Sequence, residues 1–255
     1  MDTINIKAIS PVLQEMTNAI VKAVGPDFEE FKNSNKLASM NYLHMLRGDL
    51  INDNLQYLHT VLDLRKFKRV AWEGRICIDR ENKVTLCIIS DRTLKAIMKR
   101  AGGNIPHYLR TIVSVENAGM KPRYEQQSLF EGSVDSTPFT EDDFIKDFEN
   151  IMGEAITAYE GYNHLVISYA ASNGMVTSLK AICFTPKLDI ADEWNLMDMV
   201  KPDSLELTMV AESEGSRPDV HDLVSVKPSI IEAKKQNEGN VPFVSIKKRE
   251  GKKQG

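Results

Sequence analysis

Several carboxylates and one lysine have the residue types that metal-dependent DNA cleavage requires, namely two or three acids and a lysine around a divalent cation. Glu73 and Asp79 flank the first predicted hairpin, Asp91 closes the following apolar run, and Lys180 lies on a later hairpin. The usual restriction-nuclease pattern places an acid before an acid-x-lysine triplet on one strand, and residues 83–91, KVTLCIISD, lack that triplet. A metal-dependent nuclease is therefore an alternative hypothesis, and ordinary turn carboxylates are the competing interpretation.

Other catalytic patterns are missing from the sequence. Neither GxxxxGK[ST] nor GxGxxG occurs, and no GxSxG elbow occurs. The histidines lack metal-ligand spacing on any one element; they are His44, His59, His107, His164 and His221. The three cysteines all lie in apolar runs without a CxxC spacing, which is typical of buried, reduced thiols. We therefore assign no catalytic residue, no metal ligand and no cofactor, and leave open whether the protein is an enzyme.

Basic side chains give a better binding hypothesis. Residues 60–125 contain 14 basic and 7 acidic residues, whereas residues 126–225 contain 5 basic and 19 acidic residues. If the helix predicted after the first strands packs beside them, one positive face suited to phosphates results. The residues expected on this face are Arg65, Lys66, Lys68, Arg69, Arg92, Lys95 and Lys99. The competing interpretation is a solvated face that the acidic half of the chain neutralises.

The polar segment RYEQQSLFEGSVDSTPFT, residues 123–140, contains one adjacent apolar pair, Leu129 and Phe130. Gln126, Ser128 and this pair resemble the short peptide, usually written Q-L-[SD]-L-F, with which bacterial replication and repair proteins dock on the sliding clamp. Gln127 departs from the commoner leucine. The resemblance covers five residues and implies a bacterial sliding clamp as partner. An exposed apolar pair with a neighbouring amide is a plausible anchor for a hydrophobic groove.

Two other interpretations stay open for this part of the chain. Leu129 and Phe130 could instead pin the loop to the domain's own core. The acidic half, from Glu131 to Asp222, could also meet a basic partner, which would make the protein an inhibitor or adaptor. We expect a non-catalytic, DNA-associated binding protein of bacterial or phage origin, with DNA as a second partner.

The elements that position these residues follow from periodicity. Apolar residues recur at helical spacing over 6–24, and further helical signals cover 27–35 and 37–62. Two strands, 66–79 and 83–91, are expected next, with turns at Glu73-Gly74 and at 79–83. A helix over 92–103 and a strand over 107–117 precede the polar loop.

Beyond the loop, Thr140 and Asp143 form a capping-box signal for a helix. A hairpin over 164–184 turns at Asn173-Gly174, and residues 189–200 are expected to form a short acidic helix. This order predicts an α+β fold: a helical N-terminal region, then a mostly antiparallel sheet with packed helices.

The expected organisation is a helical region at 1–64, an α+β core at 65–211 with a long loop at 118–138, and a polar, basic, largely mobile tail at 212–255. The start of the chain lacks the basic and apolar regions of a signal peptide, and no apolar run is long enough to span a membrane. A cytoplasmic protein without membrane contact is therefore expected, and the sequence assigns no oligomeric state.

Overall fold

The computed structural model describes residues 4–35, 39, 42–58, 62–69, 72–99, 105–124 and 138–200. The chain divides into two units, Met1–Ala211 and Glu212–Gly255, and every described residue belongs to the first unit. No helix within the described ranges combines the length and the apolar character that crossing a membrane would require.

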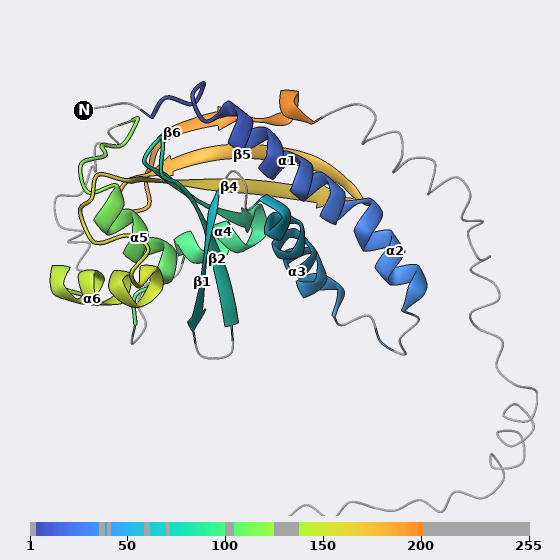
Figure 1. The fold of residues 1–255 in the computed structure, drawn as a ribbon, viewed down its shortest axis with the longest axis horizontal. Helices are drawn as coiled ribbons and strands as arrows, with labels where there is room; N and C mark the ends of the chain where they lie inside the picture. Colours follow the sequence, from blue (N-terminus) through green and yellow to red (C-terminus); the bar gives the residue numbers. More distant parts are fainter. Residues whose placement is uncertain are drawn as a thin grey trace, which may run out of the picture. The chain divides into compact units, whose positions relative to one another are not determined.

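In the described part of the chain, helices lie before, between and over the strands of one six-stranded sheet (Figure 1). In chain order the helices are α1 (Ser10–Val24), α2 (Pro26–Ser34), α3 (Leu43–Leu55), α4 (Asp91–Lys99), α5 (Tyr108–Glu116) and α6 (Glu141–Met152), with short 3-10 helices η1 (Gln56–Leu58) and η2 (Met197–Met199). The strands are β1 (Asp63–Arg69), β2 (Trp72–Asp79), β3 (Val84–Ser90), β4 (Asn163–Ser172), β5 (Met175–Phe184) and β6 (Ile190–Asn195). The predicted α+β class, with a helical N-terminal region and a mostly antiparallel sheet, is confirmed.

The strands follow one another in chain order across the sheet, β1-β2-β3-β4-β5-β6. All neighbouring pairs are antiparallel except β3 and β4, which are parallel. The sheet therefore consists of two three-stranded meanders that meet at one parallel pair. The segment carrying α4, α5 and α6 connects them, as a parallel pair requires.

Helices lie on both faces of this sheet, and each face has its own apolar core. One core joins α1 and α3 to the inward residues of β4 and β5. The other joins α4, α5 and α6 to the opposite face of the strands. Alternate residues of a strand point to opposite faces, so in β4 Leu165 and Ile167 belong to the first core and Val166 belongs to the second.

Local signals explain several elements. In α1, Val12, Leu13, Met16 and Ile20 are buried on one side, and the helix ends before Gly25. The predicted capping box at the start of α6 is present, as Thr140 and Asp143 each accept the other's backbone N–H.

Between β4 and β5, Asn173 and Gly174 both have positive φ, at 50° and 71°, as a tight hairpin turn requires. The hairpin predicted over 164–184 is therefore confirmed.

Two expected elements were wrong. The strand predicted over 107–117 is instead the helix α5, because Leu109, Ile112 and Val113 share one buried helical face although the segment is rich in β-branched residues. Residues 189–200 contain strand β6 and the short η2 instead of an acidic helix. This edge strand pairs on one side only, so its half-exposed positions accept acidic side chains.

The first turn of the meander was also misplaced. Glu73 and Gly74 lie inside β2, where they pair with Lys68 and Phe67 of β1. A β-carbon on Gly74 would stand 2.4 Å from the ring of Phe67, so this glycine lets an aromatic ring lie against the strand.

Candidate functional site

The hollow of greatest chemical interest lies where β2 and β3 separate. The two strands pair only through Cys77–Asp79 and Val84–Leu86. Over the rest of their described lengths, β2 pairs only with β1, and β3 pairs only with β4. Figure 1 shows β1 and β2 projecting across the direction of β4 and β5. The separation leaves a cleft of about 760 Å³ between the strands, α3 and the start of α4.

Charged and aromatic side chains line this cleft. Asp49 and Asp53 reach it from α3, and Glu73 and Arg75 reach it from β2. The Arg75 side chain is only 10% exposed, and its Nη1 lies 3.4 Å from Oε1 of Glu73. Its Nε is buried without a hydrogen-bond partner among the described residues. Trp72 stands at the cleft with 44% of its surface exposed.

The residues considered for nuclease chemistry do not come together. Glu73 opens into the cleft, whereas Asp79 lies six residues further along β2, about 20 Å away for an extended strand. Asp79 is 5% exposed and accepts hydrogen bonds from the backbone and side chain of Asn82, so it holds a turn. Lys180 pairs with Glu193 at 3.0 Å. Among the residues that the structure describes, no group of three potential metal ligands forms.

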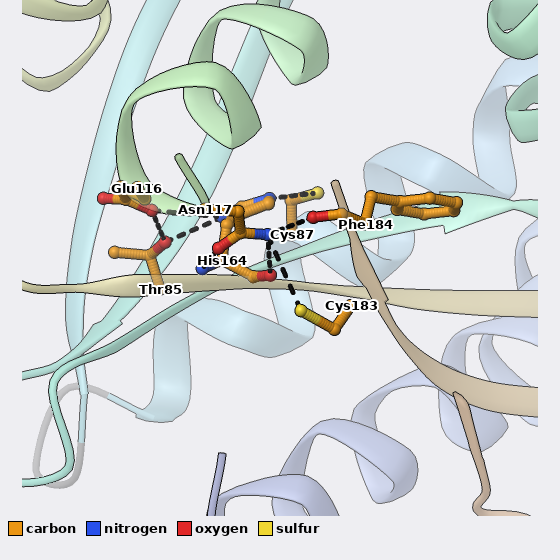
Figure 2. A network of polar contacts seen from close by, with 7 residues as sticks. All are labelled: Thr85, Cys87, Glu116, Asn117, His164, Cys183 and Phe184. Atoms are coloured by element: carbon orange, nitrogen blue, oxygen red, sulfur yellow. Dashed lines mark hydrogen bonds and ion pairs between the residues drawn. The ribbon is translucent and has the colours of Figure 1, made fainter. Parts of the chain in front are cut away.

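A chain of buried polar groups crosses the parallel junction of β3 and β4 (Figure 2). Thr85 donates its hydroxyl proton to Glu116 of α5. The same hydroxyl lies 2.7 Å from Nδ1 of His164, so that nitrogen must donate to it. In a neutral imidazole Nε2 then accepts, and the thiol of Cys87 is 3.2 Å away to donate. His164 is fully buried.

Asn117, the residue that follows α5, completes this network. Its amide Nδ2 donates to the carbonyl oxygens of His164 and Phe184, at 3.0 and 2.8 Å. Its Oδ1 accepts the backbone N–H of His164 at 2.7 Å. One side chain thereby ties the end of a helix to two strands.

The order thiol, imidazole, carboxylate is that of a nucleophile, a base and an orienting group. Cys87 does not fit the role of a nucleophile, because it is only 3% exposed and desolvation raises the pKa of its thiol far above the ordinary value. Burial also raises the pKa values of Cys77 and Cys183 to about 12. All three cysteines are free and buried, so the network joins strands and does not supply a thiolate.

The structure places the seven predicted DNA-contacting residues on different sides of the fold. Arg65 donates from Nε to the carbonyl oxygen of Ile151 at 2.8 Å, at the end of α6. Arg69 bonds Asp147 of α6 and the carbonyl oxygen of Pro106. Both arginines therefore hold α6 against the edge strand β1.

The remaining basic residues are exposed and form two groups. Lys66 and Lys68 alternate with Arg65 and Arg69 along β1, so they point to the opposite face. Arg92, Lys95 and Lys99 form a solvent-facing row on α4, whose Leu94 and Ile97 are buried. The expected continuous positive face is thus divided between the row on α4 and the lysines on β1.

The docking residues Gln126, Ser128, Leu129 and Phe130 lie outside the described residues. Their described neighbours are held to the fold. The backbone N–H of Arg123 donates to the carbonyl oxygen of Ile190 at 2.9 Å, and Thr140 begins the capping box of α6. Tyr124 is 78% exposed.

Sequence reasoning missed the cleft, and it missed the network of Thr85, His164, Glu116 and Asn117. The cleft depends on where two strands stop pairing, and no residue type marks that point. A polar residue inside each of two apolar strands was the available signal for Thr85 and His164. Thr85 and His164 can be recognised as interacting residues only when the parallel register of β3 and β4, which places them side by side, is known.

Comparison with known proteins assigns the chain to a family. Neither the search of curated proteins nor the search of solved structures gave a match. One family model matches residues 6–245, which is most of the chain. The protein therefore belongs to the family described as "Family of unknown function (DUF5986)".

Proposed function

We propose that this protein is a non-catalytic binding protein of DNA metabolism that docks on the bacterial sliding clamp through Gln126, Ser128, Leu129 and Phe130. The observation that carries the proposal is the adjacent Leu129-Phe130 pair, preceded by Gln126, in a mostly polar segment. Two neighbouring apolar side chains can fill a groove on a partner while the glutamine amide bonds its rim.

The surroundings of the segment support presentation to a partner. Arg123 on one side is bonded to β6, and Thr140 on the other side starts α6. A segment whose flanking residues are fixed loses less conformational entropy on binding than a free chain does. The exposed Tyr124 leads directly into the docking segment.

The basic row on α4 supports a supplementary contact with DNA. Arg92, Lys95 and Lys99 are exposed, and no ion pair engages them within the described part of the chain. Each lysine or arginine that meets a phosphate releases about one counterion, so the expected contribution is non-specific and dependent on salt. Arg65 and Arg69 are assigned to α6 instead, because their guanidinium groups already bond that helix.

The test is a binding titration of the full-length protein against a purified bacterial sliding clamp. The Leu129→Ala/Phe130→Ala variant should bind at least tenfold more weakly, while its unfolding temperature stays within about 2 °C of wild type. Val134→Ala, an apolar truncation in the same segment but outside the motif, is the matched control and should bind as wild type does. Equal clamp binding by the double variant refutes the proposal. A large fall in its unfolding temperature shows instead that the pair packs within the protein's own core.

A second candidate is an inhibitor or adaptor whose acidic half meets a basic partner. The first turn of α6 presents three exposed carboxylates, Glu141, Asp142 and Asp143. This candidate predicts no retardation of DNA at low salt and a partner complex that dissociates as salt rises. DNA retardation that disappears when the α4 row is replaced by glutamine contradicts it.

A further inference from the structure

The cleft between β2 and β3 exposes the edges of two strands to each other. Residues Trp72–Ile76 of β2 and Cys87–Ser90 of β3 pair on one side only within the described chain. The facing sides therefore carry backbone N–H and C=O groups that an additional strand can satisfy. The shorter edge has four residues, which is about 13 Å of extended chain.

A buried donor in the same cleft lacks an acceptor. Nine-tenths of the Arg75 side chain is buried, and its Nε has no partner among the described residues. An unsatisfied buried N–H is costly, and a carbonyl oxygen brought in by a ligand would satisfy it. Arg75 belongs to the stretch of β2 that is unpaired with β3, and it lines the cleft, so a backbone placed along that edge lies close to it.

The charges around the cleft indicate which class of ligand it favours. Among the described residues that line the cleft, Asp49, Asp53 and Glu73 outnumber the cation Arg75, whose charge Glu73 already partly neutralises. Lys66 and Lys68 stand opposite Arg75 and Glu73 on β1, one strand away from the cleft, and do not line it. These carboxylates repel the phosphates of a nucleic acid and attract lysine or arginine side chains. The exposed Trp72 offers an aromatic face for an apolar or cationic side chain.

We propose that the cleft binds an extended, basic peptide segment of a partner protein, which adds as a strand between β2 and β3. Its backbone bonds the open edges, one of its carbonyl oxygens accepts from Nε of Arg75, and its basic side chains meet Asp49, Asp53 and Glu73. None of these residues belongs to the docking segment, so this interaction is independent of the proposed clamp contact.

The test uses defined peptides and the full-length chain carrying Trp194→Phe, which leaves Trp72 as the single tryptophan. The probes are a set of capped seven-residue peptides that alternate lysine with valine, isoleucine, phenylalanine or tyrosine, and their glutamate counterparts. Trp72 fluorescence should report micromolar binding of lysine peptides that weakens as salt rises, and no binding of glutamate peptides. Hydrogen exchange should slow at residues 74–76 and 88–90 when the peptide is bound.

Two controls separate strand addition from general attraction of opposite charges. A lysine peptide N-methylated at alternate positions keeps its charge but loses backbone donors, and it should bind at least tenfold more weakly. The Asp49→Asn/Glu73→Gln variant should also bind at least tenfold more weakly, whereas Asp142→Asn, an exposed acid on α6, should have no effect.

Equal binding of the methylated peptide overturns the proposal. It is also overturned if no lysine peptide binds below millimolar concentration, or if a thymidine oligonucleotide protects the same amides in place of the peptides.

Discussion

Replacing Asn117 with alanine should be among the most destabilising single changes that remove no apolar surface. The asparagine side chain is buried, and it bonds the backbone N–H of His164 and the carbonyl oxygens of His164 and Phe184. Each hydrogen bond contributes about 1 kcal/mol net, and a donor left buried without a partner costs about 1–3 kcal/mol. Loss of these three bonds, with the N–H of His164 left buried and unpaired, therefore predicts a loss of about 4–6 kcal/mol in unfolding free energy.

The assay is reversible urea denaturation followed by circular dichroism, together with thermal unfolding. For a domain of this size, each kcal/mol lowers the unfolding temperature by about 2–4 °C, so the unfolding temperature should fall by roughly 8–24 °C. Asn35→Ala is the matched control, because Asn35 is exposed and, within the described chain, its side-chain amide donates one hydrogen bond, to the carbonyl oxygen of Phe31. That variant should lose less than about 1 kcal/mol.

The Asn117→Asp variant tests whether this side chain must donate hydrogen bonds as well as accept one. The aspartate keeps an acceptor for the N–H of His164 but sets a carboxylate against two carbonyl oxygens. At pH 7 its unfolding free energy should be no higher than that of the alanine variant. As pH falls, protonation of the new carboxylate restores a hydrogen-bond donor, so the difference in unfolding free energy from wild type should become smaller. A loss below about 1 kcal/mol in both variants refutes the account of this network.

Further predictions concern the cores, the cap of α6 and the thiols. Gly74→Ala should cost about 1–3 kcal/mol, measured by urea denaturation, because the new methyl group meets the ring of Phe67; unchanged stability would contradict that close approach. Asp143→Asn should remove a stabilising contribution at neutral pH, because hydrogen bonds from Thr140 lower the pKa of this carboxyl. In wild type that contribution is present above the unfolded pKa of about 3.9 and is lost as pH falls through the lower folded pKa, so the two proteins should converge in acid. The three cysteines should resist a thiol reagent at pH 8 in the native state and react once urea unfolds the protein; fast native labelling would show that they are open to solvent.

Elements with a strong local signal were predictable from the sequence. Asn173-Gly174 alone indicated the β4–β5 hairpin, and the capping box of Thr140 and Asp143 marked the start of α6. In both cases two or three adjacent side chains determine the backbone. Segments of mixed signal were predicted less well, since the β-branched residues of α5 favour a strand while their spacing favours a helix.

The candidate sites depend on pairings between distant parts of the chain, which one sequence does not indicate. Arg65 and Arg69 looked like free cations until α6 placed a carbonyl oxygen and a carboxylate beside them. Glu73 resembled a turn residue, although it lies on the cleft wall because β2 begins earlier than the turn signal suggested. The partner of a charged side chain is a property of the tertiary fold.

The single parallel pair in the middle of the sheet has a consequence for the order of folding. Each meander closes through local connections, whereas the β3–β4 junction brings together Thr85 and His164, which are 79 residues apart. Contacts of such long range form late, because their loop entropy is lost before their bonds are gained. We therefore expect each three-stranded half to assemble first. Pairing of β3 with β4 should then limit the rate at which the complete sheet forms.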